Sequence, residues 1–202
     1  MRENGIKSII NKKYKATTNS NHNLPLSENK LKQNFNTTRP DQVWTSDITY
    51  IWTSEGWLYL AIVLDIFSRQ IISWRVDKSL NKEFVVEAIK KSIKTRKPSG
   101  GLIFHSDRGA QYASGEVRKL LINNNITQSM SAKGNCYDNA ITETFFHTLK
   151  TELIYHAHYK TRKDAELSLF EYIEVFYNRQ RLHSSLNYLS PIEYENQFFN
   201  NK

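Results

Sequence analysis

Three strand-like runs, at residues 43–52, 57–66 and 70–76, follow one another with only a few residues between them. β-branched and aromatic residues dominate the runs, as is typical of β-strands. Segments 54–56 and 67–69 supply the turns. Because connections this short join antiparallel neighbours, the runs predict a three-stranded meander that any fold for this chain has to contain.

Strands and helices alternate in the next part of the chain. Asn81 and Ser114 are each suited to cap a helix, and a short apolar strand would follow each helix. These two strands are expected at residues 102–105 and 126–130. Alternation of this kind favours parallel pairing with right-handed crossovers.

A longer amphipathic helix is expected from about residue 138 to residue 155, with Asp138 as its cap, and Thr161 can cap another helix. The complete order predicts an α/β fold of the ribonuclease-H-like kind. Its centre would be a mixed five-stranded sheet, three strands antiparallel and then two parallel, flanked by helices and followed by a C-terminal helical extension.

Charge is spread unevenly along the chain. Residues 1–42 hold eight Lys or Arg against three Asp or Glu, within a net charge of +8 for the whole sequence. We interpret this segment as a basic, largely extended arm, residues 43–158 as the folded core, and residues 159–202 as a C-terminal helix with a basic, aromatic tail. A basic arm favours a polyanionic partner, although an arm that only aids solubility has the same composition.

Cys136 is the only cysteine, which excludes an internal disulfide and a multi-cysteine zinc site. It has no obvious base beside it, which disfavours a thiol nucleophile. No apolar run approaches the roughly 20 residues that span a bilayer, and the first residues lack the apolar centre of a signal peptide. The composition predicts a soluble, cytoplasmic protein with no membrane partner.

Two aspartates occupy positions that call for an explanation. Asp47 lies inside the first strand-like run, where an unpaired charge is costly. Asp107 follows a strand, at the edge where open sheets gather ligands. Each has a structural alternative: Asp47 could pair with a neighbouring Lys, Arg or hydroxyl, and Asp107 could form the turn before Arg108 and Gly109.

The helix expected after residue 138 carries one polar face. At about 100° per residue, Asn139, Glu143, His147 and Lys150 fall within one stripe roughly 80° wide. A separate apolar stripe is expected to bury against the sheet. For any single helix a solvated polar face is the common interpretation, so Glu143 becomes informative only together with the two aspartates.

Three carboxylates of this kind suit phosphoryl transfer. Two divalent ions roughly 4 Å apart can activate an attacking oxygen and neutralise a leaving one, and Mg²⁺ prefers carboxylate oxygens. Asp47 and Asp107 on strands would form a rigid base that Glu143 completes from a helix. Lys150, two turns after Glu143, would face a DNA phosphate. We predict that the three acids converge on a metal site that acts on DNA.

Other polar residues compete for the same role. Asp65 ends the second strand-like run and suggests turn formation and pairing with an arginine. Glu152 falls on the buried side of its helix and is expected to pair locally. His105 and His147 could bind zinc, but no His-rich spacing supports that, so His105 is interpreted as a structural or supporting group.

The same residues carry a family resemblance. The motifs occupy residues 44–50, 56–60, 65–69, 105–112, 129–131, 134–136, 138–140, 143–146 and 150–152, followed by Tyr177, Asn178, Arg181, Leu186, Tyr188, Ser190 and Pro191. From about residue 43 to residue 194 the chain closely resembles the OrfB-type transposases of bacterial insertion sequences, in the group named after insertion sequence three. These belong to the DDE transposase and retroviral integrase superfamily. The 35 residues between Asp107 and Glu143 match the spacing of that family.

The resemblance implies an integrase catalytic core that uses Mg²⁺ or Mn²⁺, with two ions, to cleave element ends and join a 3′-hydroxyl to target DNA. Asp47, Asp107 and Glu143 match the metal-binding catalytic triad, and Lys150 matches the basic residue that contacts terminal DNA. Further DNA contacts are expected from Arg108, Asn139, His147, Arg179 and Arg181.

The resemblance also implies partners. These are DNA, both element ends and target, the OrfA protein or an OrfA–OrfB fusion, and further copies of the chain assembled on DNA at the nucleoid. Full-length relatives carry an upstream helix-turn-helix and leucine-zipper region, and residues 1–42 resemble the remnant of a helical segment before the core. The chain is therefore expected to be the OrfB product alone or a shortened copy. Two alternatives stay open: a catalytically silent, DNA-binding regulatory form, and a ribonuclease-H-type nuclease.

Overall fold

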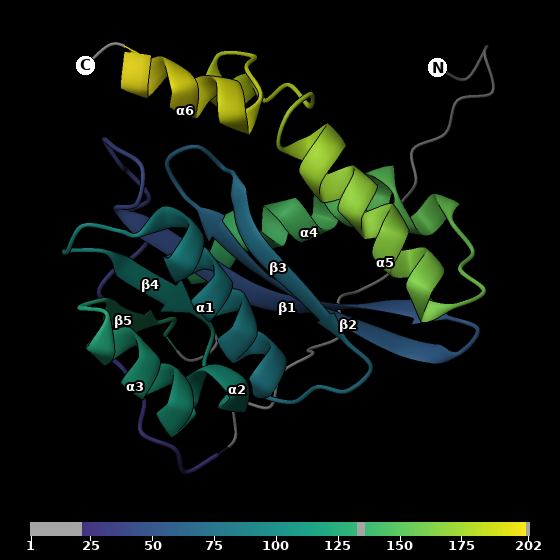
Figure 1. Cartoon of the computed structure of the whole chain (residues 1–202). Helices are drawn as coiled ribbons and strands as arrows, with labels where there is room; N and C mark the ends of the chain where they lie inside the picture. The colour runs from purple at the N-terminus through teal and green to yellow at the C-terminus, as the bar shows by residue number, and fades with distance from the viewer. Residues whose placement is uncertain (1–21, 133–135, 201–202) are drawn as a thin grey trace.

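A mixed five-stranded sheet forms the centre of the computed structural model, which describes residues 22–132 and 136–200 (Figure 1). The sheet order is β3-β2-β1-β4-β5. The strands are β1 (Val43–Thr53), β2 (Gly56–Asp65), β3 (Ile71–Asp77), β4 (Ile103–Ser106) and β5 (Thr127–Met130). The first three pair antiparallel, and β4 and β5 continue the sheet in parallel from β1. The predicted fold class is confirmed, with three antiparallel strands followed by two parallel ones.

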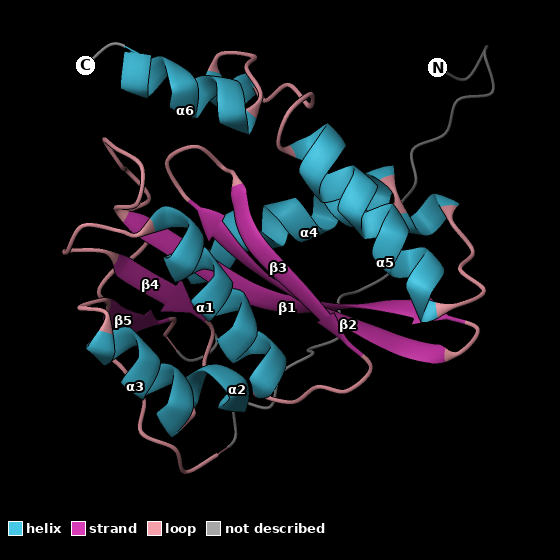
Figure 2. Cartoon of the chain, viewed as in Figure 1, coloured by secondary structure: helices cyan, strands magenta, loops and turns pink. Residues whose placement is uncertain are grey.

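Helices cover both faces of the sheet, as Figure 2 shows. One face carries α1 (Glu83–Arg96), α2 (Ala110–Ala113) and α3 (Gly115–Asn123), and the other carries α4 (Ala140–Glu152) and α5 (Arg162–Phe170). The last helix is α6 (Pro191–Asn200). Within residues 22–132 and 136–200, no helix is long and apolar enough to cross a membrane.

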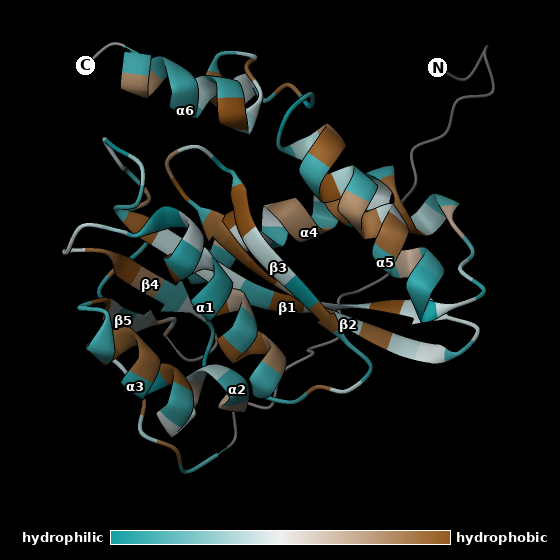
Figure 3. Cartoon of the chain, in the orientation of Figure 1, coloured by the Kyte–Doolittle hydropathy of each residue, from teal (hydrophilic) through white to brown (hydrophobic). Residues whose placement is uncertain are grey.

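The central strand β2 shows why two hydrophobic cores form. Successive side chains of a strand point to opposite faces. Leu60 and Ile62 accordingly pack with α4 and α5, while Ala61 and Val63 pack with α1 and α3. Figure 3 shows the resulting apolar colouring of the inner strands. A strand buried on both faces reads as a continuous apolar run, as β2 does.

Three predicted helix caps are confirmed. The Ser114 hydroxyl accepts a hydrogen bond from the Val117 amide at the start of α3. Thr161 caps α5, and the side chain of Asn81 accepts from the Phe84 amide at the start of α1 (3.1 Å). Hydroxyl and amide side chains satisfy the amide groups that the first helical turn leaves without partners.

The predicted cap at Asp138 is wrong. A 3₁₀ turn, η1 (Cys136–Asn139), precedes α4, and α4 begins at Ala140 without a side-chain cap. The Asp138 carboxylate instead accepts hydrogen bonds from the Ala132 amide (2.7 Å) and the Asn29 side chain (2.9 Å). The 3₁₀ turn places Asp138 inside the protein, where it joins the N-terminal segment to the chain after β5.

The ends of the long helix also differ from the prediction of one helix over residues 138–155. The α-helical part ends at Glu152, and a second 3₁₀ turn, η2 (Ile154–His156), follows it. Further along, α5 continues directly into a π-helical segment, η3 (Glu171–Tyr177). The helix α6 was not predicted; it lies in the segment that was expected to be a basic, aromatic tail.

The N-terminal segment packs along the edge strand β5. The Ser27 hydroxyl donates to Gln128 (3.0 Å) and the Lys30 amide donates to Ser129 (2.9 Å). The side chain of Leu31 is buried in the core beside α4. Residues 22–42 contain no helix and form a strap on the core, while the possible helical turn at residues 6–10 lies outside the described residues. The division into three segments stays a prediction.

Asp65, at the end of β2, is completely buried. Its carboxylate accepts hydrogen bonds from the backbone amides of Asp41 and Phe67, both at 2.8 Å. Burial raises its pKa to about 7, although the two hydrogen bonds and the charge of Arg96 oppose the shift. The predicted turn role is confirmed. The predicted arginine pairing is wrong, because Asp65 makes no ion pair among residues 22–132 and 136–200 and the nearby Arg96 pairs with Glu195 and Asp41 instead.

The raised pKa of Asp65 predicts a pH-dependent stability. Because the folded pKa lies above the value of about 4 in an unfolded chain, stability is fully present below pH 4 and is lost as the pH rises toward 7. We expect Asp65→Asn to flatten this slope by about 1 kcal/mol per pH unit. Urea unfolding between pH 5 and pH 8 measures the slope. The exposed Glu116→Gln serves as the control, and equal slopes in wild type and Asp65→Asn would contradict the assignment.

Candidate catalytic site

The two candidate aspartates lie side by side at one end of the sheet. The parallel pairing of β1 and β4 ends with Ser46 opposite Ser106. Asp47 is the next residue of β1, and Asp107 directly follows the end of β4. Adjacent strands run about 4.8 Å apart, so this register brings the two positions together. The sequence predicted each position but not the register that joins them.

Helix α4 brings Glu143 to the same place. The Thr45 hydroxyl is hydrogen-bonded to Thr142 (2.8 Å) and to the side chain of Asn139 (2.9 Å). These contacts fasten the start of α4 to β1, two residues before Asp47. Behind the site, the hydroxyls of Ser46 and Tyr112 share a buried hydrogen bond (2.8 Å).

The electrostatics of Asp47 show that the acids share one environment. Asp47 is 6% exposed, and burial raises its pKa well above the ordinary value. The charges of Asp107 and Glu143 raise that pKa further, whereas a hydrogen bond from the Ile48 amide and the charge of Lys150 lower it. Burial also raises the pKa of Glu143. Like charges placed this closely favour a cation or a proton between them.

The donor chemistry suits a hard divalent cation, because carboxylate oxygens are the ligands that Mg²⁺ and Mn²⁺ prefer. Within residues 22–132 and 136–200, no three His, Cys, Asp or Glu side chains are close enough together to hold one ion. The structure therefore brings the acids into electrostatic range without forming a complete ligand cluster. Their joint role as metal ligands stays a prediction.

Lys150 lies near Asp47 and contacts Tyr50. Its ammonium nitrogen is 5.0 Å from the centre of the Tyr50 ring, a cation–π contact. Burial lowers the pKa of Lys150, and the charge of Asp47 opposes that shift. A role for Tyr50 was not predicted from the sequence, although Tyr50 follows Asp47 by three residues in the same strand, β1.

The other predicted DNA contacts have varied surroundings. His147 is exposed on α4, and Arg179 is exposed after η3. Arg108 is half-buried and donates to the Ser131 carbonyl (2.6 Å). Asn139 is 5% exposed and is bonded to Thr45, which disfavours a DNA contact. Arg181 pairs with the Glu152 carboxylate. DNA binding by all five stays a prediction.

The competing polar residues have structural roles. Glu152 is exposed at the end of α4, so its predicted place on the buried side is wrong. The predicted pairing is confirmed, but with partners distant in the sequence: Glu152 accepts hydrogen bonds from Arg181 (2.7 Å) and from the Tyr172 hydroxyl (2.7 Å). His105 is buried and shares hydrogen bonds with Ser129 (2.9 Å) and Ser131 (3.3 Å). Burial lowers the pKa of His105 to about 4, which keeps it neutral.

The fold is that of a ribonuclease-H-like core of the integrase type. The simian T-cell lymphotropic virus intasome in complex with PP2A regulatory subunit B56 gamma matches with a TM-score of 0.66 and 16% identity, over 88% of this chain and 60% of that chain. The HTLV-2 integrase catalytic core domain in complex with magnesium matches with a TM-score of 0.60 and 15% identity, over 79% of this chain and 99% of that chain. At these identities the likeness shows the fold alone.

Sequence relatives identify the family. Two integrase core domain models match residues 37–136 and 143–199. An insertion element IS600 31 kDa protein of Shigella sonnei is 44% identical over 93% of this chain and 69% of its own length. The transposase InsF for insertion sequence IS3A of Escherichia coli is 42% identical over 98% of this chain and 68% of its own length. The chain belongs to the integrase core family of insertion-sequence transposases, and its function is that of a DDE transposase in transposition.

Proposed function

We propose that Asp47, Asp107 and Glu143 are the catalytic triad and that together they hold two divalent metal ions, Mg²⁺ or Mn²⁺. The observation that carries the proposal is the shared electrostatic environment in which Asp107 and Glu143 both raise the pKa of buried Asp47. Bound cations would remove this repulsion. The magnesium complex of a retroviral integrase core with the same fold supports the choice of metal.

Each acid has its own part in the proposal. The metal, when bound, would activate the attacking oxygen and stabilise the charge on the leaving one. Asp47 and Asp107 form the fixed part of the site, because Asp47 is paired with β2 within β1 and Asp107 directly follows the last paired residue of β4. The half-exposed Glu143 side chain completes the ligand set from the start of α4, so it has to approach the two aspartates. Lys150 orients the DNA strand by contacting a phosphate.

The substrates follow from the family. We infer that the chain cleaves the ends of its element and joins a DNA 3′-hydroxyl to a target strand, breaking one phosphodiester bond as another forms. Its partners are the element ends, target DNA and further copies of the chain, with an OrfA protein or OrfA–OrfB fusion as an additional partner. The matching transposases of bacterial insertion sequences support DNA as the substrate and the bacterial cytoplasm as the location. The matching intasome supports assembly into a multimer.

A joining assay tests the proposed function. The purified chain is incubated with labelled element-end DNA and target plasmid in Mg²⁺, in Mn²⁺ and in EDTA. We expect cleavage and joined products in either metal and none in EDTA, with activity restored when metal is added back. Products that form equally in EDTA would contradict metal-dependent transfer.

A silent, DNA-binding regulatory form is the alternative that the joining assay separates from an active transposase. The OrfA–OrfB fusion is the positive comparison in the joining assay. Binding of element ends without cleavage in either metal, under conditions where the fusion is active, would establish the silent form.

Lys150→Ala separates DNA contact from metal binding. We expect weaker binding to element-end DNA and a salt dependence reduced by about one phosphate contact, because one cation no longer displaces a counterion. Fluorescence anisotropy at a series of salt concentrations measures the slope. Lys90→Ala, exposed on α1 at the opposite face of the sheet, is the matched control. An unchanged slope in Lys150→Ala would count against the contact.

A further inference from the structure

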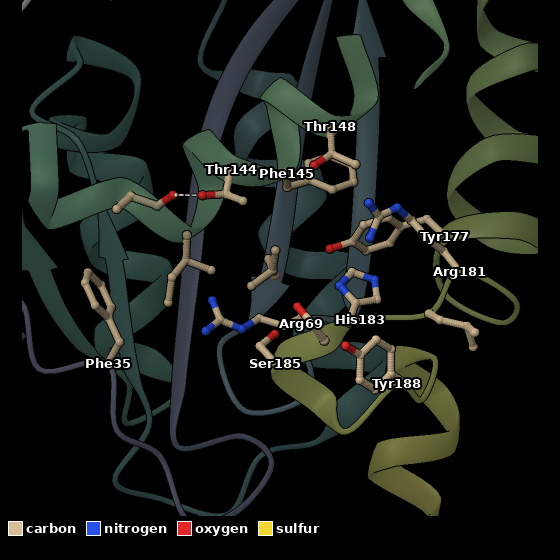
Figure 4. Close-up of a pocket in the computed structure, with 15 residues that line it drawn as sticks. Phe35, Arg69, Thr144, Phe145, Thr148, Tyr177, Arg181, His183, Ser185 and Tyr188 are labelled. Atoms are coloured by element: carbon tan, nitrogen blue, oxygen red, sulfur yellow. Dashed lines mark hydrogen bonds between the residues drawn. The ribbon is translucent and has the colours of Figure 1, made fainter. Parts of the chain in front are cut away.

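A cleft of about 580 Å³ lies between α4 and the segment that follows η3 (Figure 4). Thr144 and Thr148 line it from α4, and His183 and Tyr188 line it from the C-terminal segment. Arg69 enters it from the turn after β2. The volume lies within the range of about 300–1,000 Å³ that is usual for ligand pockets. The catalytic proposal uses none of these side chains.

Arg69 carries a charge that the described structure does not balance. Its backbone is left-handed, with φ of 61°, which is uncommon for a residue other than glycine. Burial lowers the pKa of its guanidinium. Among residues 22–132 and 136–200 Arg69 makes no ion pair, whereas Arg181 in the same cleft is paired with Glu152. A half-buried cation without a counter-charge is costly, and an anionic ligand would offset that cost.

His183 supplies a second polar group without a partner. Its Nε2 atom is buried and has no hydrogen-bond partner in the described part of the chain. The ring packs edge-on against Tyr177, with ring centres 5.0 Å apart. Burial and the charges of Arg181 and Arg69 lower the pKa of His183 to about 4, so the imidazole is neutral near pH 7. A neutral imidazole nitrogen can donate or accept a hydrogen bond to a ligand.

Tyr188 places an aromatic ring at the mouth of the cleft. It is 71% exposed. Asn187 and Tyr188 both have left-handed backbones, with φ of 56° and 59°. Two successive residues in this conformation are strained, and strained backbone often marks a ligand site. An exposed aromatic ring in the same cleft as a half-buried cation and a hydrogen-bonding group suits an unpaired nucleotide.

The cleft adjoins the catalytic face of α4. Thr144 follows Glu143 directly, and Thr148 lies about one turn further along. At about 100° per residue, both threonines project 100–140° around the helix from Glu143. A helix with its side chains is about 10–12 Å across. A DNA strand that reaches Glu143 can therefore also reach the cleft.

We propose that this cleft binds an unpaired nucleotide of the DNA substrate, with Arg69 contacting its phosphate, His183 forming a hydrogen bond and Tyr188 stacking on its base. Guanidinium groups recognise phosphate oxygens through paired hydrogen bonds, and aromatic rings stack on any unpaired base. A base within an intact duplex is not free to enter. The proposal rests on the proposed function, because it assumes that DNA lies along α4.

Binding of two DNA duplexes tests the proposal. One has blunt ends and the other has a short unpaired overhang, and anisotropy measures both dissociation constants in EDTA with the full chain. We expect wild type to prefer the overhang by about 5- to 140-fold, the range for one stacked base. Arg69→Asn and Tyr188→Asn should each bring the ratio of the two dissociation constants close to one. Asparagine is chosen because it tolerates the left-handed backbone at both positions. Arg118→Gln on α3 loses one charge elsewhere and should keep the wild-type preference.

Further variants and competitors in the binding experiment distinguish loss of the cleft from other causes. Arg69→Lys retains the charge and should retain most of the preference, and melting curves verify that every variant is folded. Nucleoside monophosphate should compete for the overhang far better than inorganic phosphate does. No preference in wild type, a full preference in Arg69→Asn and Tyr188→Asn, or equal competition by inorganic phosphate would overturn the proposal. Asp47→Asn should keep the preference, so a failed joining assay and a failed cleft are distinguishable.

Discussion

Asp47→Asn, Asp107→Asn and Glu143→Gln are each expected to abolish strand transfer, with a loss of about 10³-fold or more, as for other catalytic groups that act as a unit. Each substitution keeps the size of the side chain and removes one negative charge. A site of three carboxylates that loses one binds a divalent cation more weakly and positions it less well. The joining assay in Mg²⁺ measures the loss.

Two further acids provide controls for these substitutions. Asp77 ends β3 and Glu116 lies in the first turn of α3, outside the proposed triad, and Asp77→Asn and Glu116→Gln make the same chemical changes. Both controls should join DNA at the wild-type rate. Near-normal joining by a folded, purified variant of one of the three acids would remove that residue from the triad.

Asp47→Asn is also expected to stabilise the metal-free protein while it removes activity. Burial and the charges of Asp107 and Glu143 raise the pKa of Asp47, so ionisation of Asp47 opposes folding. A raised folded pKa means that stability is lost as the pH rises, and the variant should gain most at the alkaline end. The gain should be on the order of 1–2 kcal/mol, or about 2–4 °C in melting temperature for each kcal/mol.

Thermal unfolding in EDTA and in Mg²⁺ measures this effect. Added Mg²⁺ should raise the melting temperature of wild type, because a ligand that binds the folded state stabilises it, and should leave Asp47→Asn nearly unchanged. Asp77→Asn should be destabilising, because hydrogen bonds from Ser79 and Asn81 outweigh slight burial and lower the pKa of Asp77. A metal-free Asp47→Asn that melts below wild type would contradict the repulsion inferred at this site.

The fold was predictable because its signals are local. The apolar runs and short turns of the meander specified β1, β2 and β3, and Ser114 and Thr161 marked two helix starts. The start of α6 also carries a local signal, in which Ser190 and Glu193 exchange hydrogen bonds around Pro191. Serine followed three residues later by glutamate is a capping box, and proline favours the first helical position.

The site was predictable only in part. Asp47 and Asp107 could be singled out because each carboxylate interrupts or ends an apolar strand, and Glu143 because of its helical face. The contacts that bring them together depend on pairing between distant segments, such as the hydrogen bonds from Thr45 to α4. Asn139 shared the polar stripe with Glu143 but is buried against β1. Helical periodicity alone does not show which part of a stripe faces a neighbouring strand.

Diffraction from crystals of the protein soaked in Mn²⁺ is the most direct test of the proposed metal site. Anomalous scattering locates the ion independently of its ligands. We expect Mn²⁺ density in contact with carboxylate oxygens of Asp47, Asp107 and Glu143, with Glu143 closer to the two aspartates than in the metal-free protein. Density elsewhere, or an ion held by the aspartates while Glu143 stays apart, would contradict the three-carboxylate site.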